Sequence, residues 1–502
     1  MNCVSRIQLR RWNSSVRQIG QPIHATHPHI IAENDGMLQS LIEKVTIGIT
    51  STEYAMRRQM VASMLELKDI AIIPGHGLRY ATHGIFYPFH QQTDLFYLTG
   101  LNEPNACLTI QNNDKPSTLF VHPFDKNTER WDGPRSGLDG ATTIFKVETA
   151  IPITQFEKHL QSLVNNGQIN TIHTNLPLLE PIKHSPFQGT NISTVSASAT
   201  HPVDAVEASD YLSQVRLTTD GKLSSWLFGK VKVNSLDSMI ENFRLYKSSS
   251  EFKLMRKSGQ IAGRSFVEAM KKTKPGMTEH QIHAELEYNC KMQGATGLSY
   301  VPVVAGGTNA LILHYVQNQQ ILKDGDLVLV DAGAEYGGYA SDITRTWPVN
   351  GKFSPAQRDI YQIVLDTQKE IIKKCAIDGK TSLNSLQYDT NELLREKLAE
   401  LFKRPIRRRE LNNVYPHHVG HYIGLDVHDT PTISRSKPLE AGMCITIEPG
   451  LYIPDEPEYG QYRGIGVRIE DDLYISENGP VVLSVEAPKE IIDIETIMSN
   501  PK

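Results

Sequence analysis

The feature that most constrains this fold is a β-hairpin pattern over residues 326–349, because it carries two aspartates. Two apolar, β-branched runs flank a Tyr-Gly-Gly turn at residues 336–338. If the turn is centred on its Tyr-Gly pair, Asp331 and Asp342 are directly opposed, with Cβ atoms about 5 Å apart. Carboxylates that close in a half-buried sheet repel each other unless a cation or a shared proton compensates. The hairpin therefore predicts either a metal site or a strained carboxylate pair.

Length and composition limit the class of protein. A chain of 502 residues with an apolar fraction of 39% is long enough for two packed domains. A net charge of −5 gives no electrostatic case for nucleic acid as a partner. No run reaches the ~18 apolar residues of a spanning helix, so we expect no membrane span. The cysteines are scattered without a CxxC pair, which indicates a reducing compartment and no thiolate zinc site: Cys3, Cys107, Cys290, Cys375 and Cys444.

Residues 1–33 have the composition of a mitochondrial transit peptide. They contain several serines and four arginines, and their first acidic residue is Glu33. They lack the continuous apolar core of a secretory signal. The alternative is a basic terminus without a targeting role. We expect a mitochondrial protein, in the matrix, and a start at Met37 would give a cytosolic form.

Residues 38–240 have the pattern of a mixed α/β domain. A helix is expected from Ser51 or Thr52, with an acidic residue in its first turn. Residues 165–204 have little pattern and are predicted to be loops or an insertion. Short apolar runs bounded by Gly, Pro or Asn predict strands at Ile70–Ile73, Leu95–Leu98, Ala106–Ile110 and Ser117–Val121.

Residues 248–492 have the pattern of a second α/β domain. Capping boxes, pairing Ser248 with Glu251 and Thr278 with Gln281, open two predicted helices. Two further helices follow the hairpin, the first of which begins at Pro355. The order of two helices and then strands occurs twice, which suggests a structural duplication.

Four further stretches contain candidate site residues. His314 ends the apolar run 311–315, and Glu448 ends an apolar strand. Arg468 and Glu470 alternate on another predicted strand and so face the same side. Taken singly, such residues are usually structural ion pairs or hydrogen-bonded histidines. The fourth stretch, 416–429, contains four histidines in a segment too rich in glycine for one regular helix: His417, His418, His421 and His428.

Taken together, Asp331, Asp342, His421, Glu448 and Glu470 form an oxygen-rich set with one imidazole. Four carboxylates carry four negative charges, which two divalent cations balance. Mostly oxygen ligands and no thiolate favour manganese, cobalt or iron over a structural zinc. Two ions about 3.5 Å apart would bridge a hydroxide nucleophile and polarise a scissile carbonyl.

This set and its surroundings resemble the pita-bread metallopeptidases, which include methionine aminopeptidase, prolidase and aminopeptidase P. The stretches that carry the resemblance are PHHVGHYIGLDVHD at 416–429 and ITIEPGLYI at 445–453. The segments at 87–108 and 129–137 resemble the amino-terminal domain of aminopeptidase P. The mitochondrial branch of that family, the intermediate-cleaving peptidases, is similar also at 20–30, 53–58 and 462–472.

The resemblance implies a ribonuclease-H-like amino-terminal domain and a pita-bread catalytic domain with two αβ halves related by a pseudo-two-fold. It implies two manganese ions, peptide or protein N-termini as substrates, and a homodimer. His421 and Glu448 would hold one ion and Asp331 the other, with Asp342 and Glu470 bridging both.

The resemblance also implies roles around the metals. Glu448 would shuttle the proton of the bridging hydroxide. His428 would meet the substrate carbonyl, and His314 would stabilise the tetrahedral intermediate. Tyr300 would contact substrate. His417 and Arg468 would support the ligands as a pair.

The expected function is removal of a single N-terminal residue, ahead of proline or from a processed presequence end. A prolidase limited to dipeptides is the alternative, and the long amino-terminal domain argues against it. A non-catalytic binding module and a metal-free amidinohydrolase are disfavoured because all five ligands are present.

Overall fold

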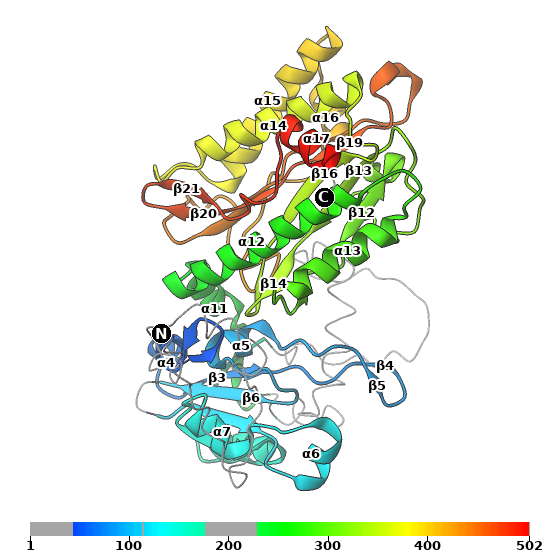
Figure 1. Cartoon of the computed structure of the whole chain (residues 1–502). Helices are drawn as coiled ribbons and strands as arrows, with labels where there is room; N and C mark the ends of the chain where they lie inside the picture. The colour runs from blue at the N-terminus through cyan, green and yellow to red at the C-terminus, as the bar shows by residue number, and fades with distance from the viewer. Residues whose placement is uncertain (1–43, 113–114, 176–226, 228, 501–502) are drawn as a thin grey trace, which may run out of the picture. The chain divides into compact units, whose positions relative to one another are not determined.

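The computed structural model describes residues 44–112, 115–175, 227 and 229–500. The chain forms two compact units (Figure 1): Met1–Val45 with Thr50–Leu236, and Thr46–Ile49 with Asp237–Lys502. The predicted leader and Met37 lie outside the described residues, as does most of the weakly patterned segment. Both units are mixed α/β structures, as predicted.

The N-terminal unit is built on a six-stranded mixed sheet of order β10-β9-β3-β6-β7-β8. β6 pairs antiparallel with β3 and β7, and the other neighbours are parallel. The strands are β3 (Asp69–Pro74), β6 (Cys107–Gln111), β7 (Thr118–Val121), β8 (Thr149–Pro152), β9 (Thr171–Thr174) and β10 (Lys232–Asn234). Short strands lie outside this sheet: β1 (Lys44–Thr46), β2 (Ile49–Thr50), β4 (Tyr80–Thr82) and β5 (Ile85–Phe86).

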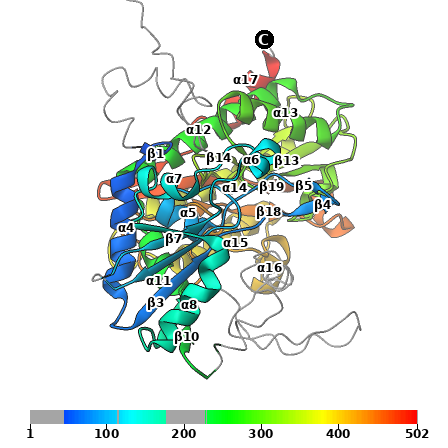
Figure 2. The same cartoon turned by 90° about the horizontal axis from the view of Figure 1, so that it is seen from below.

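Helices cover this sheet because their apolar residues pack on its buried side chains. α8 (Phe156–Asn165), which lies near β3 and β10 in Figure 2, contributes Phe156 and Leu160 to a core with Ile70 and Ile172. The other helices are α4 (Ser51–Met64), α5 (Thr93–Thr99), α6 (Lys126–Asp132) and α7 (Gly137–Thr143). α4 begins at Ser51, as predicted, and Thr50 caps it by accepting from the Glu53 N–H.

One strand prediction in this unit is wrong. Leu95–Leu98 lies in helix α5, where the Gln92 side chain accepts from the Leu95 N–H and Gly100 ends the helix at φ 73°. A short apolar run has no period that separates a strand from a helix, and the cap residues decide between them. The other three predicted strands correspond to β3, β6 and β7.

The two N-terminal stretches that carry the resemblance are joined inside this unit. The Glu103 carboxylate accepts the Ser136 N–H at 2.8 Å and also the Ser136 hydroxyl. Gln91 donates to the carbonyl oxygens of Leu101 and Glu103. Gln91 therefore fixes Glu103 within the first stretch, and Glu103 joins that stretch to the second.

The C-terminal unit repeats the order of two helices and then strands, as predicted. Each of its four long helices opens with a capping box, including the two predicted at Ser248 and Thr278. α12 packs beside α13, and α14 packs beside α15 (Figure 1). The helices are α11 (Asp237–Arg244), α12 (Ser249–Lys272), α13 (Glu279–Met292), α14 (Pro355–Lys374), α15 (Leu383–Phe402), α16 (Arg408–Val414) and α17 (Ile491–Ser499).

The strands of this unit form small antiparallel sheets, including β12-β13-β16 in the first half and β17-β20-β21 in the second. The first half contains β11 (Gly297–Leu298), β12 (Val303–Gly306), β13 (Leu327–Ala332), β14 (Ala334–Tyr336), β15 (Tyr339–Ala340) and β16 (Ile343–Pro348). The second contains β17 (Cys444–Ile447), β18 (Gly450–Tyr452), β19 (Gly466–Arg468), β20 (Asp471–Ser476) and β21 (Gly479–Val482).

The hairpin forms, but its register differs from the one that we expected. Asp331 is opposite Thr344 rather than Asp342, because the turn residues are Gly337 and Gly338, at φ 62° and 86°. A two-residue turn with positive φ at both positions suits Gly-Gly and not Tyr-Gly. Asp342 lies two residues before Thr344, so it becomes a diagonal neighbour of Asp331 on the same face.

The stretch predicted to be one strand, carrying Arg468 and Glu470, forms two strands. β19 pairs with β18 and β20 pairs with β17, while Glu470 lies between β19 and β20. The Glu470 N–H donates to the Thr344 carbonyl at 3.0 Å. This bond anchors the segment that carries Glu470 to the hairpin.

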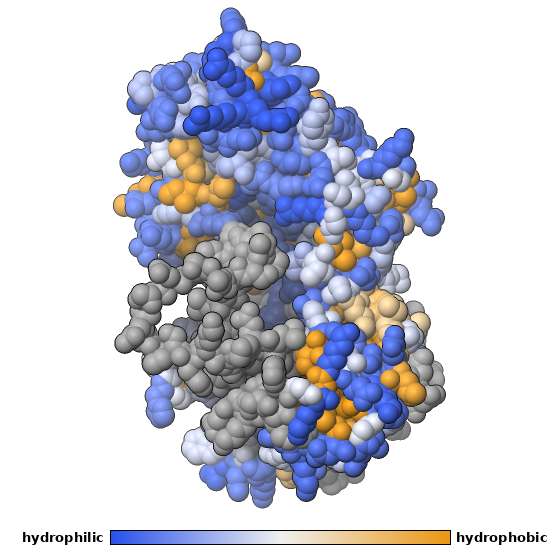
Figure 3. All heavy atoms as spheres, turned by 180° about the vertical axis from the view of Figure 1, so that it is seen from behind, coloured by the Kyte–Doolittle hydropathy of each residue, from blue (hydrophilic) through white to orange (hydrophobic). Residues whose placement is uncertain are grey.

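None of the described helices is long and apolar enough to cross a bilayer. On the face drawn in Figure 3, the described surface is largely hydrophilic, with hydrophobic atoms in separate groups.

A buried ionic cluster joins the hairpin to the end of the chain. The Asp471 carboxylate accepts from Arg345 at 2.6 Å and from Lys489 at 2.5 Å. Gln368 and Ser484 each donate to it at 2.7 Å. Burial would raise the pKa of Asp471, but Arg345 and Lys489 outweigh it and hold the pKa well below its usual range.

Replacing Asp471 by Asn should destabilise the C-terminal unit, because it leaves Arg345 buried without its counter-charge. We expect a loss of about 3–5 kcal/mol in the free energy of unfolding, measured by urea denaturation of the full chain at pH 7. The pKa of Asp471 is lower in the folded state, so its contribution is present above the unfolded-state pKa of about 4 and falls with pH below it. D471N should therefore lose less stability than the wild type on acidification.

The matched control is Asp378→Asn, which removes an exposed carboxylate that accepts from the Lys380 and Thr381 N–H groups. An unfolding midpoint for D471N equal to that of this control would contradict the stabilising role of Asp471 as the counter-charge of Arg345.

Candidate metal centre

The two hairpin carboxylates converge on one hydroxyl group. The Tyr300 hydroxyl lies 2.5 Å from Oδ1 of Asp331 and 2.5 Å from Oδ1 of Asp342. One hydroxyl hydrogen serves one acceptor at a time, so two acidic oxygens crowd around a single donor. Burial and the two aspartates raise the pKa of Tyr300 well above its usual range, which keeps it protonated.

His421 is positioned by the strand that follows it. Its backbone carbonyl accepts the Thr446 N–H at 2.9 Å, and the approach is so close that a Cβ on Gly420 would lie 1.9 Å from the Thr446 carbonyl oxygen. Nδ1 of His421 lies 3.0 Å from the Tyr422 carbonyl oxygen and donates to it. Nε2 is therefore the ring nitrogen that faces Asp342, and its proton must leave before the ring can bind a metal.

The remaining carboxylates complete the cluster. Nε2 of His421 lies 3.4 Å from Oδ2 of Asp342 and 3.8 Å from Oε1 of Glu448. One ligand atom from each of Asp342, His421 and Glu470 lies within 4.8 Å of the others, an arrangement that could hold a metal ion. The structure thus places all five predicted ligands near one another. They are Asp331 on β13, Asp342 between β15 and β16, His421 after α16, Glu448 between β17 and β18, and Glu470 between β19 and β20.

Arg468 and His417 are linked through a residue that sequence reasoning missed. Arg468 donates to Oδ2 of Asp331 at 2.5 Å and to the Tyr452 hydroxyl at 2.7 Å. The Tyr452 hydroxyl lies 2.9 Å from Nε2 of His417, whose Nδ1 is 3.8 Å from Glu448. Alternation along the strand, which places residues 448, 450 and 452 on one side, was the available signal.

Thr344 is a second residue that the sequence did not identify. Its hydroxyl donates to Oε2 of Glu470 at 2.6 Å and accepts from Nε of Arg468 at 3.1 Å. It lies two residues after Asp342 on the same strand face, so alternation again gave the signal.

His428 and His314 lie beside the cluster. The rings of His421 and His428 have centroids 4.5 Å apart. Burial and His421 lower the pKa of His428 to about 4. His314 lies in the turn after η3 (Gly307–Leu311), next to Tyr315. Tyr315 packs in one cluster with Tyr452, which contacts Arg468 and His417.

The carboxylates lack enough positive charge to be ionised together. Burial raises the pKa of Glu448 to about 7, that of Glu470 well above its usual range, and that of Asp331. Burial acts the same way on Asp342, but its hydrogen bond with His421 lowers the pKa overall. His421 would itself lose basicity by burial, yet Asp342 and Glu448 raise its pKa to about 9.

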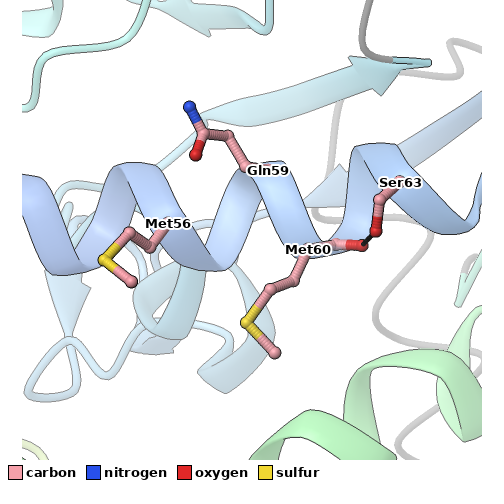
Figure 4. A pocket seen from close by; sticks show the side chains of 4 residues that line it. All are labelled: Met56, Gln59, Met60 and Ser63. Carbon is pink, nitrogen blue, oxygen red and sulfur yellow. Dashed lines mark hydrogen bonds between the residues drawn. The ribbon is translucent and has the colours of Figure 1, made fainter.

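This donor set fits divalent cations. Arg468 offsets one of the four negative charges, and hard oxygen donors with one imidazole are the ligands that such ions prefer. A pocket of 560 Å³ in the N-terminal unit has a different lining (Figure 4). Its described lining is Met56, Gln59, Met60 and Ser63 of α4, with no titratable side chain among them.

Two family models and several known proteins match this chain. Residues 253–477 match the model of metallopeptidase family M24, and residues 54–173 match that of the aminopeptidase P N-terminal domain. Xaa-Pro aminopeptidase 3 of Rattus norvegicus is 37% identical over 96% of this chain and 91% of that protein. Intermediate cleaving peptidase 55, mitochondrial, of Arabidopsis thaliana is 36% identical over 99% and 92%.

Solved structures give the same result for the fold. The crystal structure of Icp55 from Saccharomyces cerevisiae has a TM-score of 0.75 and 34% identity, covering 92% of this chain and all of that chain. The chain therefore belongs to the aminopeptidase P group of metallopeptidase family M24.

Proposed function

We propose that this metallopeptidase removes a single N-terminal residue from peptides or proteins with the help of two manganese ions. The observation that carries the proposal is the convergence of Asp342, His421 and Glu470, whose ligand atoms lie within 4.8 Å of one another. Asp331 and Glu448 lie beside this group, the first through the Tyr300 hydroxyl and the second 3.8 Å from His421. The names of its relatives, Xaa-Pro aminopeptidase and intermediate cleaving peptidase, agree with that chemistry.

The ligands divide between the two ions. His421 and Glu448 would hold one ion and Asp331 the other, and both ions would share Asp342 and Glu470. The short distances from Asp342 to His421 on one side, and through Tyr300 to Asp331 on the other, support this division. Oxygen-rich donors without a thiolate favour manganese over a structural zinc.

The surrounding residues bind, orient and move protons. When bound, the ions supply an activated water and polarise the scissile carbonyl. Glu448, which lies 3.8 Å from Nε2 of His421, would take a proton from the attacking water and return it to the leaving amine. His428 contacts the substrate carbonyl, and His314 stabilises the tetrahedral intermediate. Arg468 holds Asp331, and Tyr452 joins Arg468 to His417.

The substrates are N-termini with proline in second position, ends left by presequence cleavage, or both. Two relatives are named for these two activities, and one name adds a mitochondrial location. The arginine-rich composition of residues 1–33, without an acidic residue before Glu33, supports a transit peptide and a matrix location. We propose a homodimer.

A prolidase restricted to Xaa-Pro dipeptides is the second candidate. The aminopeptidase P N-terminal domain at 54–173 argues against it. The complete ligand set likewise argues against a non-catalytic binding module.

Asparagine substitutions should separate the roles of the two aspartates. Asp342→Asn removes a bridging ligand, so metal content should fall to near zero and kcat/KM by about 10³-fold or more. Asp331→Asn should remove chiefly one ion and leave about one per chain. Metal analysis of manganese-loaded, desalted protein measures both, with Asp326→Asn, at the start of the same hairpin, as the control. Equal metal loss from D331N and D342N would contradict the division of ligands.

Peptide length distinguishes the two peptidase candidates. Manganese-loaded protein should release the first residue from Xaa-Pro-Xaa tripeptides or from peptides that copy processed presequence ends. Turnover of Xaa-Pro dipeptides should be much slower, and product analysis by mass spectrometry measures all three. Cleavage of the dipeptides alone would establish a prolidase, and no release from any substrate would overturn the proposed function.

A further inference from the structure

A buried carboxylate outside the metal centre has four hydrogen-bond donors. Glu279, the first residue of α13, is fully buried. Its Oε1 accepts from the Gly306 N–H at 2.8 Å and from Nδ2 of Asn309 at 2.9 Å. Its Oε2 accepts from the Tyr315 hydroxyl and from the Gln320 N–H, both at 2.8 Å. All four donors are neutral, and all come from one segment, 306–320.

This segment carries His314. Glu279 contacts its first residue, its last residue and the residue next to His314, and the Glu279 N–H donates back to the Gln320 carbonyl at 2.9 Å. A single side chain therefore closes the base of a loop whose exposed turn holds the histidine beside the metal centre.

The loop depends on such contacts because it has little regular structure. After η3, residues 312–320 form no helix or strand. Tyr315 is buried next to exposed His314, and its ring packs in a cluster with Tyr452, the residue that contacts Arg468 and His417. A shift of Tyr315 would therefore displace His314 directly.

A carboxylate suits this position better than its amide. Glu279 accepts two hydrogen bonds on each oxygen, and the start of a helix favours a negative charge. A glutamine would point its NH₂ group, itself a donor, at one of the two pairs of donors. Each pair includes a backbone N–H, which can only donate and so would lose its acceptor. A buried donor left unsatisfied is unfavourable, and the loop relieves this by moving.

We propose that Glu279 is a positioning residue for the peptidase reaction and acts through His314. It fixes segment 306–320 so that His314 is held against the metal centre. This inference rests on the proposed function, in which His314 contacts the reacting substrate.

A double-mutant cycle tests this coupling. Glu279→Gln, His314→Ala and the double variant are compared with the wild type, with manganese, on an Xaa-Pro-Xaa peptide. We expect E279Q to lower kcat/KM by about 10–100-fold, mostly in kcat, with metal content unchanged. In the H314A background, E279Q should lower kcat/KM by less than about 3-fold, because the histidine that Glu279 positions is already absent. Equal fold-losses in the two backgrounds would overturn the proposal.

Glu241→Gln is the matched control. Glu241 is a buried carboxylate of the same unit that accepts from the N–H of Thr432 at 2.7 Å and from its hydroxyl at 2.5 Å, outside segment 306–320. E241Q should change kcat/KM by the same factor in the wild-type and the H314A backgrounds.

Hydrogen exchange gives a readout that does not depend on activity. E279Q should speed amide exchange in 306–320 while leaving α12 and β13 protected, and unchanged exchange in 306–320 would overturn the positioning role. Tyr315→Phe, which removes one donor only, should show a smaller effect in the same direction and covers the case in which E279Q fails to fold. An H314A enzyme of full activity would reject the role of His314, and with it this inference, whereas an inactive wild type would reject the proposed function itself.

Discussion

The repulsion among four buried carboxylates is the constraint on which the catalytic unit is built. Asp331, Asp342, Glu448 and Glu470 come from separate stretches of chain and meet where burial penalises each charge. The fold holds them there through backbone bonds, such as the one from the Glu470 N–H to the Thr344 carbonyl. Cations in the cluster would turn this repulsion into binding energy, since the ligands are already assembled.

Hydrogen bonds behind the carboxylates fix which oxygens face the centre. Arg468 donates to one oxygen of Asp331 and also to the Tyr452 hydroxyl, which in turn orients His417. Thr344 holds Glu470 while it accepts from Arg468. Because each of these groups has a partner on both sides, removal of one should disturb several ligands. Glu279 extends the same principle outward, to the loop that carries His314.

The sequence singled out side chains that the fold brings together, but it predicted their geometry less well. Asp331 and Asp342 stood out because like charges in a hairpin need an explanation, but their direct opposition was wrong, since the Gly337-Gly338 turn shifts the register. Leu95–Leu98 was taken for a strand because a run of four residues cannot reveal a helical period. Tyr452 and Thr344 were missed because an ordinary tyrosine or threonine on a strand carries no mark of its partners. Glu279 looked like a helix-start residue, and only the tertiary fold brings residues 306–320 to it.

Calorimetry can test directly whether the carboxylates and His421 bind two cations and lose protons as they do so. Metal-depleted protein is titrated with Mn²⁺ at pH 7 in buffers of different ionisation enthalpy. Without metal, burial keeps the pKa of Glu470 high and that of Glu448 near 7, while the carboxylates hold the pKa of His421 at about 9. These groups must lose protons to become ligands. We expect two ions per chain, with release of about one proton or more per chain. A stoichiometry below two, or binding without proton release, would contradict this expectation.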